Sequence, residues 1–101
     1  MNESACLDAI DAWLKNMADG LWEHHNGITI ESTDNPGWMM RIDLANNLSK
    51  DASPVHAALS KLTMAEGIVK DGVLILYSEG LASLVQGAAF MIDQLEKREA
   101  D

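Results

Sequence analysis

The chain has 101 residues, of which 48% are hydrophobic and 23% are charged. This composition is that of one folded domain, residues 1–101, and excludes an intrinsically disordered chain. A formal net charge of −9 repels phosphate groups, so nucleic acid and anionic membranes are poor partners and a basic protein is a good one. Net negative charge also promotes solubility by itself, and this second interpretation of the acidity stays open.

Three features of the sequence bear on the cellular location. No segment approaches the roughly 18 consecutive apolar residues of a membrane span. The N-terminus MNESACLDAI carries acids where a signal peptide carries bases, so we expect a cytoplasmic protein. The single Cys6 cannot form an internal disulfide, which fits a reducing compartment. Because Cys6 falls on an apolar helix stripe, we expect a buried thiol.

Residues 4–18 have the apolar spacing of an amphipathic helix. The stripe consists of Cys6, Ile10, Trp13, Leu14 and Met17. Ser4 is a suitable N-cap, and Asp19-Gly20 is a suitable end.

Three short strands are predicted next, at residues 21–24, 28–33 and 38–44. Asn26-Gly27 separates the first two and is a strong hairpin signal, because both residue types tolerate positive φ. At the next break, Asp34-Asn35-Pro36-Gly37, proline presets φ and glycine supplies the positive φ that follows it. The alternation from Trp38 to Leu44 is typical of a half-buried strand, so the sequence predicts an antiparallel meander.

The second half contains two predicted helices around a β segment. Ser53-Pro54 starts the first helix, with serine as its cap, and the apolar spacing ends near Glu66-Gly67. Residues 68–78 form either a hairpin turned at Asp71-Gly72 or a single strand, and the apolar run 73–77 belongs in the centre of the sheet. A helical stripe follows from Leu81 to Leu95, in which Gly87 permits close contact with the sheet.

These elements predict an α+β fold, with helices packed on one face of an antiparallel meander sheet in the order α-β-β-β-α-β-α. Glycine-rich phosphate loops, nucleophile elbows and cysteine–histidine signatures are absent from the sequence, so we expect no cofactor and no enzymatic activity. A metal site would use Glu23, His24 and the remote His56, but neighbouring strand residues such as His24 and His25 point to opposite faces.

Recognition of a protein partner is the favoured function. Residues 1–44 hold eight acids against Lys15 and Arg41, and tryptophan is enriched at interface hot spots. Alternation places Trp38 on the buried face with Met40, whereas Trp22 shares the more open face with His24. The predicted partner-binding residues are Trp22, Glu23, His24, Glu31, Asp34 and Asn35.

The run DGLWEHHNGITIESTDNPGWMMRIDL, residues 19–44, closely resembles the signature of the immunity protein 53 family of bacterial polymorphic toxin systems. The matching features are Asp19-Gly20, Trp22-Glu23-His24, Gly27-Ile28, Ile30, Thr33, Asp34-Asn35-Pro36-Gly37-Trp38 and Ile42-Asp43-Leu44, with Trp13 in the preceding helix. The resemblance implies a small α+β protein, not an enzyme, that binds and neutralises a toxin made beside it in the producer's cytoplasm.

The main hypothesis is therefore stoichiometric binding, in which an acidic and rigid surface docks on a basic toxin domain with electrostatic steering. A second hypothesis is a small metal-dependent hydrolase that uses Glu23, His24 and His56. A third is an oligomeric adaptor whose terminal helix stripe is a dimer seam. Both a monomer and a homodimer fit the sequence, since one apolar stripe serves a core and a seam equally well.

Overall fold

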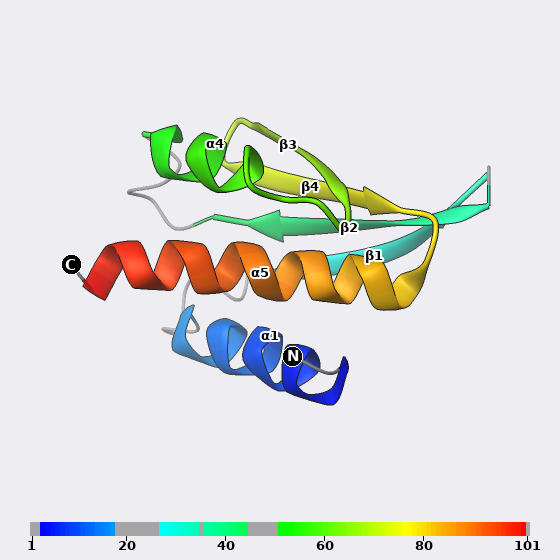
Figure 1. The fold of residues 1–101 in the computed structure, drawn as a ribbon, viewed down its shortest axis with the longest axis horizontal. Helices are drawn as coiled ribbons and strands as arrows, with labels where there is room; N and C mark the ends of the chain where they lie inside the picture. Colours follow the sequence, from blue (N-terminus) through cyan, green and yellow to red (C-terminus); the bar gives the residue numbers. More distant parts are fainter. Residues whose placement is uncertain (1–2, 18–26, 35, 45–50, 101) are drawn as a thin grey trace.

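The computed structural model describes residues 3–17, 27–34, 36–44 and 51–100. The described elements follow the chain in the order α1 (Glu3–Met17), β1 (Ile28–Thr33), β2 (Gly37–Asp43), α4 (Ser53–Leu59), β3 (Glu66–Lys70), β4 (Val73–Ser78) and α5 (Leu81–Ala100). Figure 1 shows α5 running along the sheet, with α4 on the side of β3 and α1 on the other side of α5.

The sheet consists of two antiparallel hairpins in the order β1-β2-β4-β3. β2 and β4 pair antiparallel in the centre and join the hairpins, with Met40 opposite Leu76 and Ile42 opposite Leu74. β1 and β3 are the two outer strands of this described sheet. The apolar run 73–77 therefore lies in the centre of the sheet, as predicted.

One face of the sheet carries the core, and all three described helices contribute to it. Met40 and Ile42 from β2 and Leu74 and Leu76 from β4 are at most 1% exposed. Helical residues pack on them to form a single cluster: Trp13 from α1, Val55 and Ala58 from α4, and Leu84, Ala88, Met91, Ile92 and Leu95 from α5. Full burial of one such large apolar side chain contributes about 1.5–3 kcal/mol. The predicted α+β fold with helices on one sheet face is confirmed.

The predicted strands at 28–33 and 38–44 correspond to β1 (Ile28–Thr33) and β2 (Gly37–Asp43). The predicted strand at 21–24 and the turn residue Asn26 lie outside the described residues. Residues 68–78 form the hairpin of β3 and β4, the first of the two alternatives. Asp71 and Gly72 have φ values of 53° and 79°, which are the left-handed angles that a two-residue hairpin loop of this kind requires.

Several boundary predictions were wrong. Ser4 lies inside α1 instead of capping it. Ser53 is the first residue of α4 and its N–H donates to Oδ1 of Asp51 at 3.1 Å, so serine is not the cap. The α4 helix ends at Leu59, well before Glu66 and Gly67, which belong to β3.

Two glycines have roles that differ from the predicted ones. Gly37 does not have the positive φ expected of a turn; it is the first residue of β2, opposite Thr33. A Cβ atom on Gly37 would lie 3.1 Å from Thr33 Oγ1 and 3.2 Å from the Ser78 carbonyl oxygen. Gly87 approaches Ala65 in the segment after α4, where an added Cβ would meet the Ala65 Cβ at 3.0 Å, so its close contact is not with the sheet.

Candidate recognition surface

The sheet face opposite the core carries a mixed surface of apolar and charged side chains, here called the open face. Directly opposed residues of antiparallel strands share a face, so the pairing register defines its rows. One row consists of Glu31, Met39, Tyr77 and Glu66, and the next of Thr29, Arg41, Ile75 and Ile68. Ile68 is 52% exposed and Tyr77 is 39% exposed. An apolar centre with a carboxylate at each end of one row is a surface suited to a protein partner.

Charge on the sheet is strongly asymmetric. The two hairpins, residues 28–43 and 66–79, carry two bases, Arg41 and Lys70. Their six acids are Glu31, Asp34, Asp43, Glu66, Asp71 and Glu79. The sheet side of the molecule therefore attracts a basic surface and repels an acidic one.

Two of the six predicted partner-binding residues lie in the described part of the chain. Glu31 is exposed in β1 on the open face, and Asp34 is exposed in the loop between β1 and β2. The structure places them on the same hairpin, three residues apart in the chain. Trp22, Glu23, His24 and Asn35 lie outside the described residues. Trp38 is half-buried and packs against the core, in agreement with its predicted structural role.

Gly27 and Asp43 join the start of β1 to the end of β2 with two reciprocal hydrogen bonds. The Gly27 N–H donates to Oδ2 of Asp43 at 2.8 Å, and the Asp43 N–H donates to the Gly27 carbonyl oxygen at 3.1 Å. Hydrogen bonds to a charged group are roughly twice as strong as neutral ones. The carboxylate of Asp43 therefore stabilises the open end of the hairpin, a role that the pattern of the sequence alone did not reveal.

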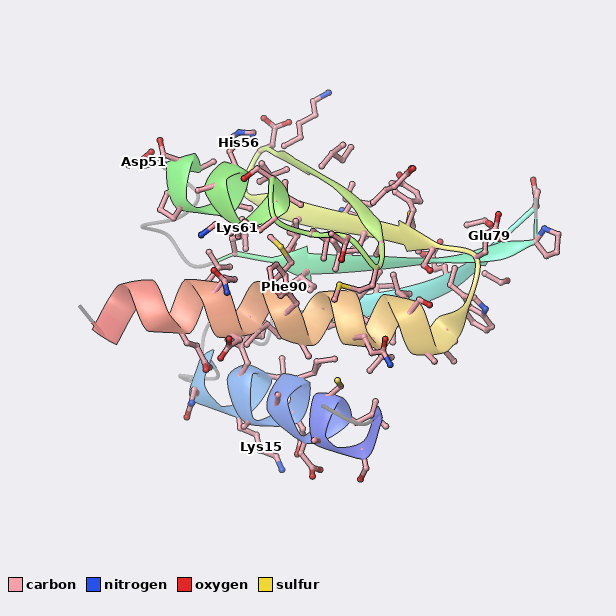
Figure 2. The ribbon with its side chains drawn as sticks, in the orientation of Figure 1. Lys15, Asp51, His56, Lys61, Glu79 and Phe90 are labelled. Atoms are coloured by element: carbon pink, nitrogen blue, oxygen red, sulfur yellow. The ribbon has the colours of Figure 1, made fainter. Side chains whose placement is uncertain are left out.

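A groove opens at the end of the sheet where β1 ends and β2 begins. It has a volume of about 580 Å³ and is lined by residues 33, 36–38, 63–66 and 77–79, here called the sheet-end groove. Figure 2 shows Glu79 at this end of the molecule, away from His56 on α4 and Lys15 on α1. Three segments that are distant in the chain thus meet at one site, and the first of them contains Pro36, Gly37 and Trp38 of the Asp-Asn-Pro-Gly-Trp motif.

The lining of the sheet-end groove is acidic. Glu66 and Glu79 contribute carboxylates, and no lysine, arginine or histidine is among the described residues that line it. Both glutamates are exposed. Trp38, Met64 and Tyr77 supply apolar wall area, and Thr33, Thr63 and Ser78 supply hydroxyl groups. This chemistry suits a cationic group on an aliphatic stem.

The glutamates of the groove were missed by sequence reasoning. Glu66 was assigned to the end of a helix and Glu79 to no predicted element, so neither was linked with the motif at 34–38. Only the pairing of β2 with β4, and of β4 with β3, brings them to the same end of the sheet.

The described residues give little support to metal chemistry. Within them, no three histidine, cysteine, aspartate or glutamate side chains are grouped as a metal site. His56 is exposed on α4, and Glu23, His24 and His25 lie outside the described residues. Cys6 is 2% exposed against Val85 and Ala89, which confirms the predicted buried thiol.

The stripe of the terminal helix is used inside the molecule. Leu84, Met91 and Leu95 are at most 5% exposed and belong to the core cluster. These residues are therefore not available as the dimer seam on which the adaptor hypothesis depended. Among the described helices, none combines the length and apolar character needed to cross a membrane.

Comparison with known proteins gives one family. The family model described as Immunity protein 53 matches residues 7–67 of this chain. The matched region runs from α1 to the start of β3 and includes the whole β1–β2 hairpin, Asp43 and two of the three segments of the sheet-end groove. No curated protein and no solved structure matches the chain.

Proposed function

This chain belongs to the immunity protein 53 family, and we propose that it binds a cognate bacterial toxin domain and neutralises it in the cytoplasm of the cell that makes both. The family match over residues 7–67 carries this proposal. Neutralisation by binding needs no catalytic group, only a surface that covers or distorts the toxin.

The charge of the chain supports a basic toxin as the partner. With a net charge of −9 and six acids on the two hairpins, the protein attracts a basic domain over a distance of about 8–10 Å in physiological salt. Such steering raises the association rate, which matters for an inhibitor that must reach a toxin before the toxin reaches its target.

The β1–β2 hairpin is the proposed centre of the contact. Glu31 on the open face and Asp34 in the loop are exposed, and the strand that carries Glu31 is fixed by six residue pairs with β2 and by the Gly27–Asp43 bonds. A side chain on a rigid strand loses less entropy on binding than one on a flexible loop. Trp22, Glu23, His24 and Asn35, which precede or adjoin this hairpin in the chain, complete the proposed contact.

A rescue assay tests the function. The toxin domain encoded beside this gene is expressed with and without this protein, and surviving cells are counted. We expect survival to be restored by the wild-type chain and reduced by the double variant Glu31→Lys, Asp34→Lys. The matched control is Asp8→Lys with Glu96→Lys, since both acids are exposed on the helical side and the change of net charge is identical.

Three outcomes of the assay distinguish the proposed neutralising function from the proposed contact surface. Rescue by the wild type and by the control, but not by the hairpin variant, supports both. Rescue by the wild type and by both variants keeps the function and moves the contact away from Glu31 and Asp34. Absence of rescue by the wild type, with an active toxin and both proteins soluble, contradicts the proposed function.

A further inference from the structure

We propose that the sheet-end groove receives a lysine or arginine side chain of the toxin, and that Glu66 and Glu79 pair with its charged end. This inference rests on the proposed function and names a specific contact within it. It concerns residues outside the predicted set, because neither glutamate was singled out from the sequence.

Charge complementarity selects the occupant. Two carboxylates line the groove, and the described lining contains no base that would neutralise them. Both side chains are exposed in the unbound protein, so they remain hydrated until a partner covers the groove. If an anionic or purely apolar group filled the groove, the two carboxylates would lose their water without compensation. A guanidinium or ammonium group instead replaces that water with charge-assisted hydrogen bonds.

The apolar part of the lining fits the stem of the same side chain. Lysine and arginine bury their methylene groups along apolar surface and keep the charged end at a polar position. Trp38, Met64 and Tyr77 are the lining residues that provide that surface. Aromatic rings also attract cations at their faces, and the hydroxyl groups of Thr63 and Ser78 are further acceptors within the lining.

The walls of the groove are held in place before binding. The Gly80 N–H donates to the Ser78 Oγ at 3.4 Å in the turn that presents Glu79. Gly37 packs so closely that a Cβ would lie 3.2 Å from the Ser78 carbonyl oxygen, and Trp38 lies opposite Ser78 in the register of β2 with β4. Glu66 lies opposite Tyr77 in the register of β3 with β4. A preformed site of this kind avoids part of the ordering cost of association.

The groove also gives the family motif a second role. Pro36, Gly37 and Trp38 form one wall, so the motif shapes the opening as well as connecting two strands. The partner's basic residue would enter beside the Asp34 loop, where a further exposed carboxylate strengthens the attraction.

The test compares two double variants of the full chain, each of which replaces two carboxylates with uncharged amides. Glu66→Gln with Glu79→Gln removes both charges and keeps side-chain size, and Asp8→Asn with Glu96→Gln is the matched control on α1 and α5. The dissociation constant for the toxin domain is measured at two salt concentrations. We expect the groove variant to bind at least about tenfold more weakly and with a flatter salt dependence, and the control to change affinity by less than about twofold.

A third variant tests whether a basic group already present in the groove blocks binding of the toxin. Thr63→Arg places a base of the chain's own in the groove, and we expect it to weaken toxin binding as strongly as loss of the glutamates. Thr63 is exposed after α4, so the change leaves the core intact, and an unchanged melting temperature verifies this.

A scan of the toxin identifies the inserted residue. Each exposed lysine and arginine of the toxin is replaced by glutamine and tested against the wild type and the Glu66→Gln, Glu79→Gln variant. One replacement should weaken binding to the wild type at least about tenfold and have no further effect on the variant. Unchanged affinity of the groove variant, or the absence of any such coupled residue, overturns the inference while leaving the function intact. Failure of the wild type to bind contradicts both.

Discussion

Loss of the Asp43 carboxylate should open the start of the β1–β2 hairpin. In Asp43→Ala the Gly27 N–H loses its acceptor at 2.8 Å, while the backbone bond from the Asp43 N–H to the Gly27 carbonyl oxygen is retained. A hydrogen bond to a charged group contributes about 1.5–3 kcal/mol. Because this site is only half-buried and water can replace the acceptor, we expect a loss near the lower end, about 1.5 kcal/mol.

The assay is urea unfolding followed by tryptophan fluorescence, together with a thermal melt. For a domain of 60–100 residues, about 1 kcal/mol corresponds to roughly 4–8 °C in Tm, so Asp43→Ala should lower the Tm by about 6–12 °C. Asp43→Asn keeps an oxygen acceptor in the same place and should lose less than half as much. Amide exchange of Gly27 reports the local effect and should be faster in Asp43→Ala.

The matched control is Asp34→Ala, which removes an exposed loop carboxylate of the same hairpin. Its stability should stay within about 0.5 kcal/mol of the wild type, as is usual for surface positions. Wild-type stability and wild-type exchange of Gly27 in Asp43→Ala would refute the assigned role of this carboxylate.

Four further substitutions test packing and turn geometry, each by urea unfolding. Gly37→Ala should lower the free energy of unfolding by about 1 kcal/mol, because the added Cβ crowds the Ser78 carbonyl oxygen. In the control Gly27→Ala the added Cβ meets nothing within 4 Å, so its stability should stay within about 0.5 kcal/mol of the wild type. Equal effects of the two substitutions would contradict the close approach at Gly37. Leu76→Ala, at 0% exposure, should cost about 2–5 kcal/mol, and a value below that range would show that β4 is not central to the core. Gly72→Ala, at φ 79°, should cost about 1 kcal/mol through left-handed strain, and wild-type stability would contradict the turn geometry.

Local patterns predicted most of the secondary structure because local chemistry determines it. Asp71-Gly72 predicted a hairpin loop, and both residues have the positive φ that such a loop needs. Alternation through Trp38, Met40 and Ile42 predicted which face of β2 is buried, since strand side chains alternate between faces. The apolar stripe of α5 likewise predicted which side of this helix is buried, because an amphipathic helix must bury its apolar side.

Predictions that depended on distant contacts were less successful. The helix after Ser53 was predicted to end near Glu66-Gly67, yet α4 ends at Leu59 and residues 66–70 pair with β4. Gly37 was assigned a positive φ from its place after proline, whereas its small size is needed for contact with Thr33 and Ser78. The sheet-end groove could not be predicted at all, since its three segments meet only through strand pairing.

The most direct measurement of the central claim is calorimetric titration of the purified protein into its cognate toxin domain, with the residual toxin activity assayed across the same titration. We expect one protein bound per toxin domain, with activity falling to zero at the same equivalence point and affinity falling as salt rises. Absence of binding heat at any salt concentration, with the toxin fully active in the presence of excess folded protein, would contradict the account.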